Sequence, residues 1–191
     1  QVLEAPNDQG IGRYLLCDVR GAGAIVRTWS AAIDGTLRVA LDDAEEPLFE
    51  GPAHEFLQQG LQTLLLEHGL TQAAYVGSYR QRDACYFPIP FASRCRIEWV
   101  GSVQQIHFYE VQVRRYAPGT QVTGLRKADI ARCVPAARRV AKVLQDPLGN
   151  WPYRSQLDAV PVDVRIPAGQ MMDGPTLEGT QAVERLTLQV A

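Results

Sequence analysis

The stretch "GRYLLCDVRGAGAIVRTWSAAIDGTLRVALDD", residues 12–43, decides the fold class of this 191-residue chain. It contains three short runs rich in aliphatic, aromatic and β-branched residues, and turn residues separate each run from the next. The three candidate strands are 13–19, 24–31 and 36–43. Between the last two, Asp34-Gly35 tolerates the positive φ values of a tight turn, so "SAAIDGTLRV" predicts a β-hairpin.

The same pattern of short extended runs continues downstream. Further strands or strand edges are expected within 47–52, 74–91, 95–101 and 105–116. In the last of these, Glu110 and Gln112 fall on one side and Val111 and Val113 on the other. The segment 54–70 is either a helix or an irregular excursion, because its glycines weaken a single helix. Many short strands at regular spacing predict a mainly β fold, an antiparallel sandwich of the jelly-roll type.

The pattern becomes helical at residues 123–146. Apolar residues recur there at helical spacing, namely Ile130, Cys133, Val134, Ala137, Val140, Ala141 and Leu144. Pro135 is expected to divide this helix as the first-turn proline of a second segment, and Asp146-Pro147 is expected to end it. We therefore predict a jelly-roll domain over 1–122, a helical connector and linker over 123–158, and returning strands over 159–191.

Composition excludes several classes of partner and cofactor. The net charge is −2, and the arginines form no run with interleaved aromatic residues, so we expect no nucleic-acid binding. No apolar run approaches the roughly 20 residues of a membrane helix, so we expect no membrane insertion. The four cysteines and three histidines lack metal-site spacing, and "GAG" lacks the context of a dinucleotide site. We therefore expect no metal and no cofactor.

The state of the four cysteines and the compartment are left open. We interpret the cysteines as unpaired buried thiols, with one disulfide as the alternative. A periplasmic or extracellular location is favoured.

A motif near the beginning of the sequence is repeated at its end. "VRGAGAIVRTWSA" aligns with "LEGTQAVERLTLQV" without gaps. The identical pairs are Gly21/Gly179, Ala24/Ala182 and Arg27/Arg185. We interpret the second copy as the opening of a second jelly roll, and the chain as a piece of a longer protein. The expected partners are that second domain and further copies of the chain, as a homo-oligomer.

Three stretches in fixed order resemble the N-terminal half of glycoside hydrolase family 172. The first is 12–57, where a Gly-x-Gly-x-Ile stretch leads to a Trp and an arginine-bearing strand leads to an Asp before a Pro. The matching residues there are Gly21, Gly23, Ile25, Trp29, Leu37, Arg38, Asp42 and Pro47. The second is the block "CYFPIPFASRCRIEW", with Tyr86–Phe91, and the third is "HFYEVQVRRYAPGTQV". The resemblance covers residues 10–130.

The resemblance implies two jelly rolls in tandem that act on furanoside glycans with two catalytic carboxylates. One of these carboxylates lies in a Gly-x-Glu-Asp-Tyr-like signature of the second roll, and this chain contains no Glu-Asp-Tyr. We therefore assign no catalytic residue and expect the chain to be inert on its own.

The sequence also departs from the family within the covered half. His54–Leu57 replace a common Gly-Asp-Phe-Phe stretch, and Ala84-Cys85 replace a common Asn-Ser. If those polar groups shape the sugar pocket, this homologue has an altered pocket.

Three residues are candidates for sugar binding, namely Asp8, Trp29 and Tyr86. Aromatic rings stack on the apolar faces of sugars, so Trp29 and Tyr86 suit that role, although core packing explains each of them too. Asp8 belongs to a polar leader that approaches the sugar in the family, or else to a disordered terminus. His107 is interpreted as a surface histidine.

The acidic run at 42–46 is interpreted as a solvated turn, with a catalytic acid or a calcium loop as the alternatives.

Two functions follow from these observations. The first is the structural, pocket-forming half of a family-172-like hydrolase. The second is a non-catalytic carbohydrate-binding or assembly module, because jelly rolls serve many functions.

Overall fold

The computed structural model describes residues 1–70, 77–150, 164–174 and 176. The chain divides into two compact units, Gln1–Asn150 and Trp151–Ala191. The predicted strands at 159–191 and the second copy of the repeated motif lie largely outside the described residues, and 164–174 and 176 contain no helix or strand. The predicted division at residues 122 and 158 therefore stays a prediction.

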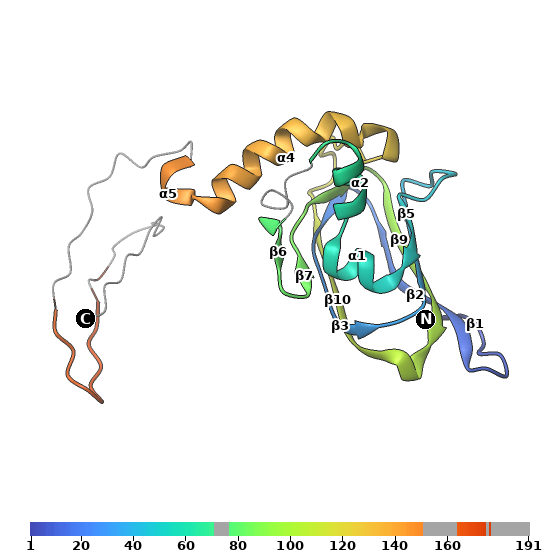
Figure 1. Cartoon of the computed structure of the whole chain (residues 1–191), viewed down its shortest axis with the longest axis horizontal. Helices are drawn as coiled ribbons and strands as arrows, with labels where there is room; N and C mark the ends of the chain where they lie inside the picture. Colours follow the sequence, from blue (N-terminus) through green and yellow to red (C-terminus); the bar gives the residue numbers. More distant parts are fainter. Residues whose placement is uncertain (71–76, 151–163, 175, 177–191) are drawn as a thin grey trace. The chain divides into compact units, whose positions relative to one another are not determined.

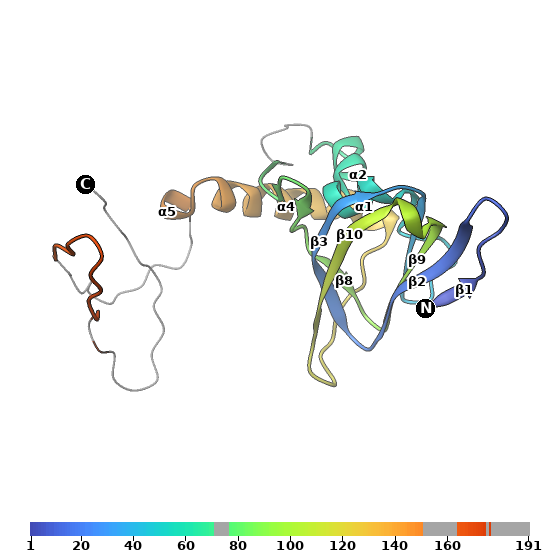
Figure 2. The same ribbon diagram turned by 90° about the horizontal axis from the view of Figure 1, so that it is seen from below.

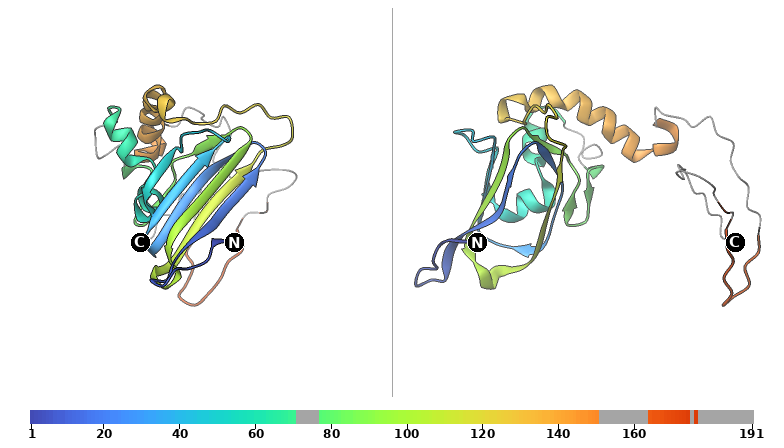
Figure 3. Two further views of the ribbon diagram at one scale, coloured as in Figure 1. Left: turned by 90° about the vertical axis from the view of Figure 1, so that its right-hand side faces the viewer. Right: turned by 180° about the vertical axis from the view of Figure 1, so that it is seen from behind.

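The first unit is a sandwich of two antiparallel sheets. Sheet A has the order β1 (Val2–Glu4), β2 (Ile11–Arg20), β9 (Arg94–Ser102), β4 (Thr36–Leu41) and β5 (Phe49–Pro52). Sheet B has the order β10 (Ile106–Arg115), β3 (Gly23–Ile33), β7 (Ala84–Cys85) and β6 (Arg80–Gln81), and β8 (Ile89–Phe91) also pairs with β3. In Figure 2, β3, β8 and β10 lie opposite β1, β2 and β9. Figure 3 shows the strands side by side. The predicted mainly β, jelly-roll-type sandwich is confirmed as a two-sheet antiparallel sandwich.

Helix α1 and a buried tryptophan contribute to the core between the sheets. Trp99 of β9 is fully buried, and its ring lies 5.3 Å from the ring of Tyr14. Helix α1 (Ala53–Gln59) contacts strands of both sheets, and α2 (Gln62–Glu67) follows it (Figure 1). The two helices are separated at Gly60, where an added Cβ would lie 2.6 Å from the Cys85 sulfur. The glycine that weakened a single helix in the sequence therefore marks a break in the structure.

The predicted hairpin at Asp34-Gly35 is wrong, because β3 belongs to sheet B and β4 to sheet A. The turn carries the chain from one sheet to the other. The Trp99 indole donates to the Asp34 carbonyl at 2.7 Å, and the Ala53 N–H donates to the Gly35 carbonyl at 2.9 Å. Gly35 has φ +86°, and a Cβ there would overlap the Val100 carbonyl oxygen. The sequence predicted the positive φ of Gly35 correctly. The turn, however, carries the chain past Trp99 from one sheet to the other and does not form a hairpin.

The predicted helix is confirmed, with a shorter range and without the division at Pro135. A 3₁₀ turn (η2, Lys127–Asp129) leads into α4 (Ile130–Gln145), and α5 (Pro147–Asn150) follows. Pro135 lies inside α4 on its exposed side, where water can satisfy the carbonyl that loses its N–H partner. None of the described helices is long and apolar enough to span a membrane.

One face of α4 packs on the sandwich, and a neighbouring row of apolar residues stays exposed. Its buried residues are Ile130, Val134, Ala137 and Ala141. The Tyr79 hydroxyl donates to the Ala137 carbonyl at 2.6 Å and fixes the helix there. Val140 and Leu144 are each 48% exposed, and Leu148 of α5 is 71% exposed. In Figure 1 this end of α4 extends beyond the sandwich.

We expect Gly35→Ala to destabilise the fold by about 3 kcal/mol or more, because the new methyl group adds a clash to the positive-φ strain. Gly119→Ala is the matched control, since Gly119 has φ +85° but nothing within 4 Å of an added Cβ. It should cost only about 1 kcal/mol. Urea unfolding of both variants measures the difference, and equal losses would contradict the role given to this crossing.

Candidate functional site

The acidic turn after β4 is built around Asp42, whose carboxylate collects the backbone donors of a second turn. The N–H groups of Ala92, Ser93 and Arg94 donate to it at 2.8, 2.7 and 3.1 Å, and the Ser93 hydroxyl donates at 3.2 Å. Both Asp42 and Asp43 adopt positive φ, at 57° and 52°. Burial alone would raise the pKa of the Asp42 carboxyl, but these donors outweigh burial and lower it.

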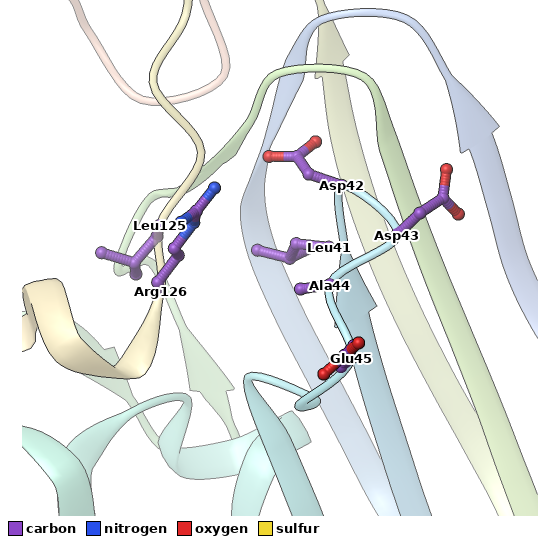
Figure 4. Close-up of a pocket in the computed structure, with 7 residues that line it drawn as sticks. All are labelled: Leu41, Asp42, Asp43, Ala44, Glu45, Leu125 and Arg126. Atoms are coloured by element: carbon purple, nitrogen blue, oxygen red, sulfur yellow. The ribbon is translucent and has the colours of Figure 1, made fainter.

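The rest of the turn faces a hollow of about 420 Å³, and Figure 4 shows Leu125 and Arg126 on its opposite side. Asp43 and Glu45 are exposed at its rim, and Asp43 pairs with Arg94 at 3.0 Å. The interpretation of a solvated turn therefore describes the rim, whereas Asp42 is a structural anchor. Its lowered pKa suits a hydrogen-bond acceptor and not an acid that delivers a proton near neutral pH.

A second group of polar and aromatic residues lies on the outer face of sheet B. Thr28 and Ser30 of β3 are buried toward the core, so the alternating residues Arg27 and Trp29 face outward. Glu110 of β10 lies directly opposite Trp29, and Gln112 lies opposite Arg27. Arg27 and Glu110 form an ion pair at 2.5 Å between Nη1 and Oε2.

Tyr86 joins this group from the segment that follows β7. The Arg27 guanidinium lies over the Tyr86 ring at 5.7 Å from its centroid, and the Tyr86 hydroxyl donates to Gln81 at 3.3 Å. Tyr86 is 39% exposed and Trp29 is half-buried. We call Arg27, Trp29, Tyr86, Glu110 and Gln112 the outer-face cluster.

The electrostatics of the outer-face cluster favour hydrogen bonding over proton transfer. The Gln112 amide and then the Arg27 guanidinium lower the pKa of the Glu110 carboxyl. Tyr86 and Glu110 raise the pKa of Arg27, although desolvation opposes them. Glu110 and Arg27 therefore stay charged at neutral pH and can accept from and donate to the hydroxyl groups of a ligand.

Among the described residues, each carboxyl group whose pKa is shifted has a pKa below its ordinary value. Besides Asp42 and Glu110, these are Asp18, which is held by Arg94, and Glu98. Burial alone would raise the pKa of Glu98, but Arg96 and Arg13 outweigh burial. A general acid of a glycosidase needs the opposite shift.

The structure brings two of the three predicted binding residues together. Arg27 lies over the ring of Tyr86, which follows β7, and Trp29 lies two residues beyond Arg27 in β3, opposite Ala84 of β7. Asp8 lies in the exposed turn between β1 and β2, on elements of sheet A. Arg27 and Glu110 were not predicted as site residues. Arg27 lies two residues before Trp29 in a strand, and that spacing was a usable signal that the two share a face.

Other reactive groups in the described part of the chain show no further site. His107 is exposed at the beginning of β10, as a surface histidine would be. All four cysteines are free, with Cys85 and Cys95 buried. Burial raises the pKa of the Cys85 thiol. Among the residues that the structure describes, no group of three or more His, Cys, Asp or Glu side chains could hold a metal ion.

A family model matches most of the chain. The family model described as the GH172 first beta-sandwich domain matches residues 2–133. No curated protein matches the chain. The matched range covers both sheets of the sandwich and the first turn of α4.

We expect Asp42→Asn to lower the free energy of unfolding at pH 7 by about 2 kcal/mol, because hydrogen bonds to a charged acceptor are lost. The folded pKa of Asp42 lies below its unfolded value of about 3.9, so the ionised form stabilises the fold above that pH. This contribution disappears as the pH falls through the folded pKa.

The wild type and Asp42→Asn should therefore differ most at neutral pH and converge in acid, as measured by denaturant unfolding at several pH values. Asp43→Asn is the control, since its exposed ion pair is worth at most about 1 kcal/mol. A gap between wild type and Asp42→Asn that persists unchanged at pH 2 would show that the carboxylate charge is not the cause.

Proposed function

The chain belongs to glycoside hydrolase family 172 as its first β-sandwich domain, and we propose that it forms one wall of a pocket for furanoside glycans without supplying the catalytic carboxylates. The observation that carries this proposal is the outer-face cluster. There, Trp29 and Tyr86 flank the Arg27–Glu110 ion pair on one side of sheet B.

The chemistry of the cluster suits a sugar. An aromatic ring covers the apolar C–H face of a furanose, while a guanidinium and a carboxylate exchange hydrogen bonds with its hydroxyls. Arg27 is held in place from two sides, by Glu110 and by the Tyr86 ring. A side chain held in this way loses little conformational entropy when it binds a ligand.

The same cluster argues against catalysis by this domain alone. Glycosidic cleavage needs one protonated carboxyl with a raised pKa beside a second carboxylate. Glu110 is ionised and committed to Gln112 and Arg27. The domain therefore recognises and positions a sugar, and the carboxylates come from elsewhere.

A second sandwich domain is the proposed source of those carboxylates, and the exposed apolar row on α4 and α5 is the proposed surface for it. Val140 and Leu144 of α4, beside the face that packs on the sandwich, and Leu148 of α5 are all exposed. Contiguous exposed apolar residues of this kind mark interaction surfaces.

The alternative, a non-catalytic carbohydrate-binding or assembly module, is favoured by one observation. Ala84 lies directly opposite Trp29, and both Ala84 and Cys85 are 3% exposed. The positions at which this sequence departs from a polar Asn-Ser therefore border the cluster. A pocket without those polar groups would bind sugars differently or have lost the hydrolytic role.

We expect Arg27→Ala to lower kcat/KM on furanoside substrates by about tenfold or more in the two-domain protein, because a charged hydrogen bond to the sugar is lost. Arg38→Ala is the matched control, since Arg38 also pairs with one carboxylate of a neighbouring strand, Glu50, but lies in sheet A. Equal effects of the two variants would contradict a sugar site at the cluster.

A glycan array with the 191-residue chain distinguishes the two functions. Binding by this chain alone supports the non-catalytic module, whereas binding and hydrolysis only by the longer protein support the pocket-wall role.

We expect Leu144→Asp to lower the melting temperature of the two-domain protein by about 4 °C or more and that of the 191-residue chain by about 1 °C or less. Leu144 is half exposed in the first unit, so only a partner domain would make the new charge costly. Arg139→Asp, at an exposed position on the opposite side of α4, is the control. If Leu144→Asp affects both proteins equally, the row is not a domain interface.

A further inference from the structure

Among the residues that the structure describes, strand β10 is a long edge strand with one side unpaired. It has ten residues and pairs with β3 alone among the described strands. Proteins usually protect such edges with short strands, lysines, prolines or bulges on the edge strand. The sequence of β10, "IHFYEVQVRR", has no lysine and no proline, and its extra residue in the pairing with β3, His107, lies at its beginning, before Phe108. Phe108 is 60% exposed, and Tyr109 and Tyr116 are each 37% exposed.

The backbone groups on the free side of β10 can be assigned. The Tyr116 N–H donates to the Ala22 carbonyl at 3.0 Å, on the side of β3. The backbone N–H and C=O groups of successive residues in a strand point to opposite sides, so those of residues 110, 112 and 114 also point toward β3. The N–H and C=O groups of residues 109, 111, 113 and 115 therefore point to the free edge.

Two copies of β10, aligned antiparallel with Gln112 at the centre, have complementary side chains. When the strand is laid antiparallel against a copy with Gln112 opposite Gln112, Glu110 comes opposite Arg114 and Phe108 comes opposite Tyr116. Opposite residues of an antiparallel pair share a face, so these contacts form twice across a two-fold axis. Opposite charges and paired aromatic rings stabilise cross-strand pairs.

We propose that the free edge of β10 binds β10 of a second copy of the chain in this register, so that two copies of sheet B form one continuous sheet. The proposal does not depend on the sugar-binding role, because the backbone pairing uses the edge of the sheet. Glu110 keeps its contacts to Arg27 and Gln112 and has lone pairs left for the partner's Arg114.

Neighbouring registers either place like charges opposite each other or lose the favourable pairs. A two-fold axis at Glu110 would place the two Glu110 carboxylates opposite each other, which is destabilising. An axis at Val111 would place Phe108 opposite Arg114 and leave Glu110 opposite Gln112. Only the axis at Gln112 joins Glu110 to Arg114 and Phe108 to Tyr116 together.

The register also fixes the hydrogen bonds. Val111 and Val113 lie opposite each other, and their free N–H and C=O groups can exchange bonds between copies. The two copies of Gln112 then form a non-hydrogen-bonded pair, in which the Cα atoms are about 4.5 Å apart. That closeness makes position 112 a direct probe of the pairing.

The first test is a charge exchange followed by analytical ultracentrifugation of the 191-residue chain. We expect the wild type to be dimeric at micromolar concentration and Arg114→Glu to weaken the dimer by about tenfold or more, since the new carboxylate then faces the partner's Glu110. Glu110→Lys should weaken it in the same way. An equimolar mixture of the two variants should recover the dimer, because both cross-strand pairs are again of opposite charge.

Arg139→Glu, on the exposed side of α4, is the control and should remain dimeric. Circular dichroism and melting curves check that each variant folds. A wild type that stays monomeric at about 100 μM, or a mixture that stays monomeric while the wild type is dimeric, overturns the proposal.

The second test does not depend on charge. Under mild oxidation, Gln112→Cys should form a disulfide-linked dimer, because the two Cβ atoms face each other across the axis. Arg114→Cys is the matched control, since it faces the partner's Glu110 and not its own copy. The wild type, with its four native cysteines, gives the background. Equal cross-linking of the two variants, or none above background for Gln112→Cys, overturns the register.

Discussion

The hydrogen bond from the Trp99 indole to the Asp34 carbonyl holds the point at which the chain leaves one sheet and enters the other. Trp99 is fully buried, and glycines surround it: a Cβ on Gly101 would overlap its ring, and a Cβ on Gly35 would lie 2.9 Å from its nitrogen. The turn can approach the ring this closely only without side chains. Because β3 and β4 meet at this turn, the indole ties sheet B to sheet A.

The position of β3 in sheet B follows from that crossing and determines what its outer face can do. With Thr28 and Ser30 directed into the core, Arg27 and Trp29 must face outward beside β10. The same pairing leaves the other side of β10 unoccupied in the described structure. Strands β3 and β10 therefore present most of the outer-face cluster together, and β10 also presents the self-complementary edge.

The sequence predicted elements better than it predicted their partners. Alternation separated Val111 and Val113 from Glu110, and in the structure the two valines pack against the core, because burial imposes a period of two within a regular strand. The Asp34-Gly35 hairpin failed because a positive φ is a local property, whereas the choice of sheet depends on Trp99, which lies 65 residues away. Arg27 and Glu110 were missed for the same reason, since their ion pair spans 83 residues. Asp42 looked like one of four solvated carboxylates until its donors, 50 to 52 residues away, were known.

The proposed recognition of a furanoside depends on the outer face of sheet B. Its most direct test is an NMR titration of the ¹⁵N-labelled two-domain protein with an arabinofuranoside or fructofuranoside oligosaccharide, observed at the tryptophan indoles. The account predicts that the Trp29 indole signal shifts with saturation, while the Trp99 indole, buried and bonded to Asp34, does not move. Saturable binding that leaves Trp29 unshifted would contradict it.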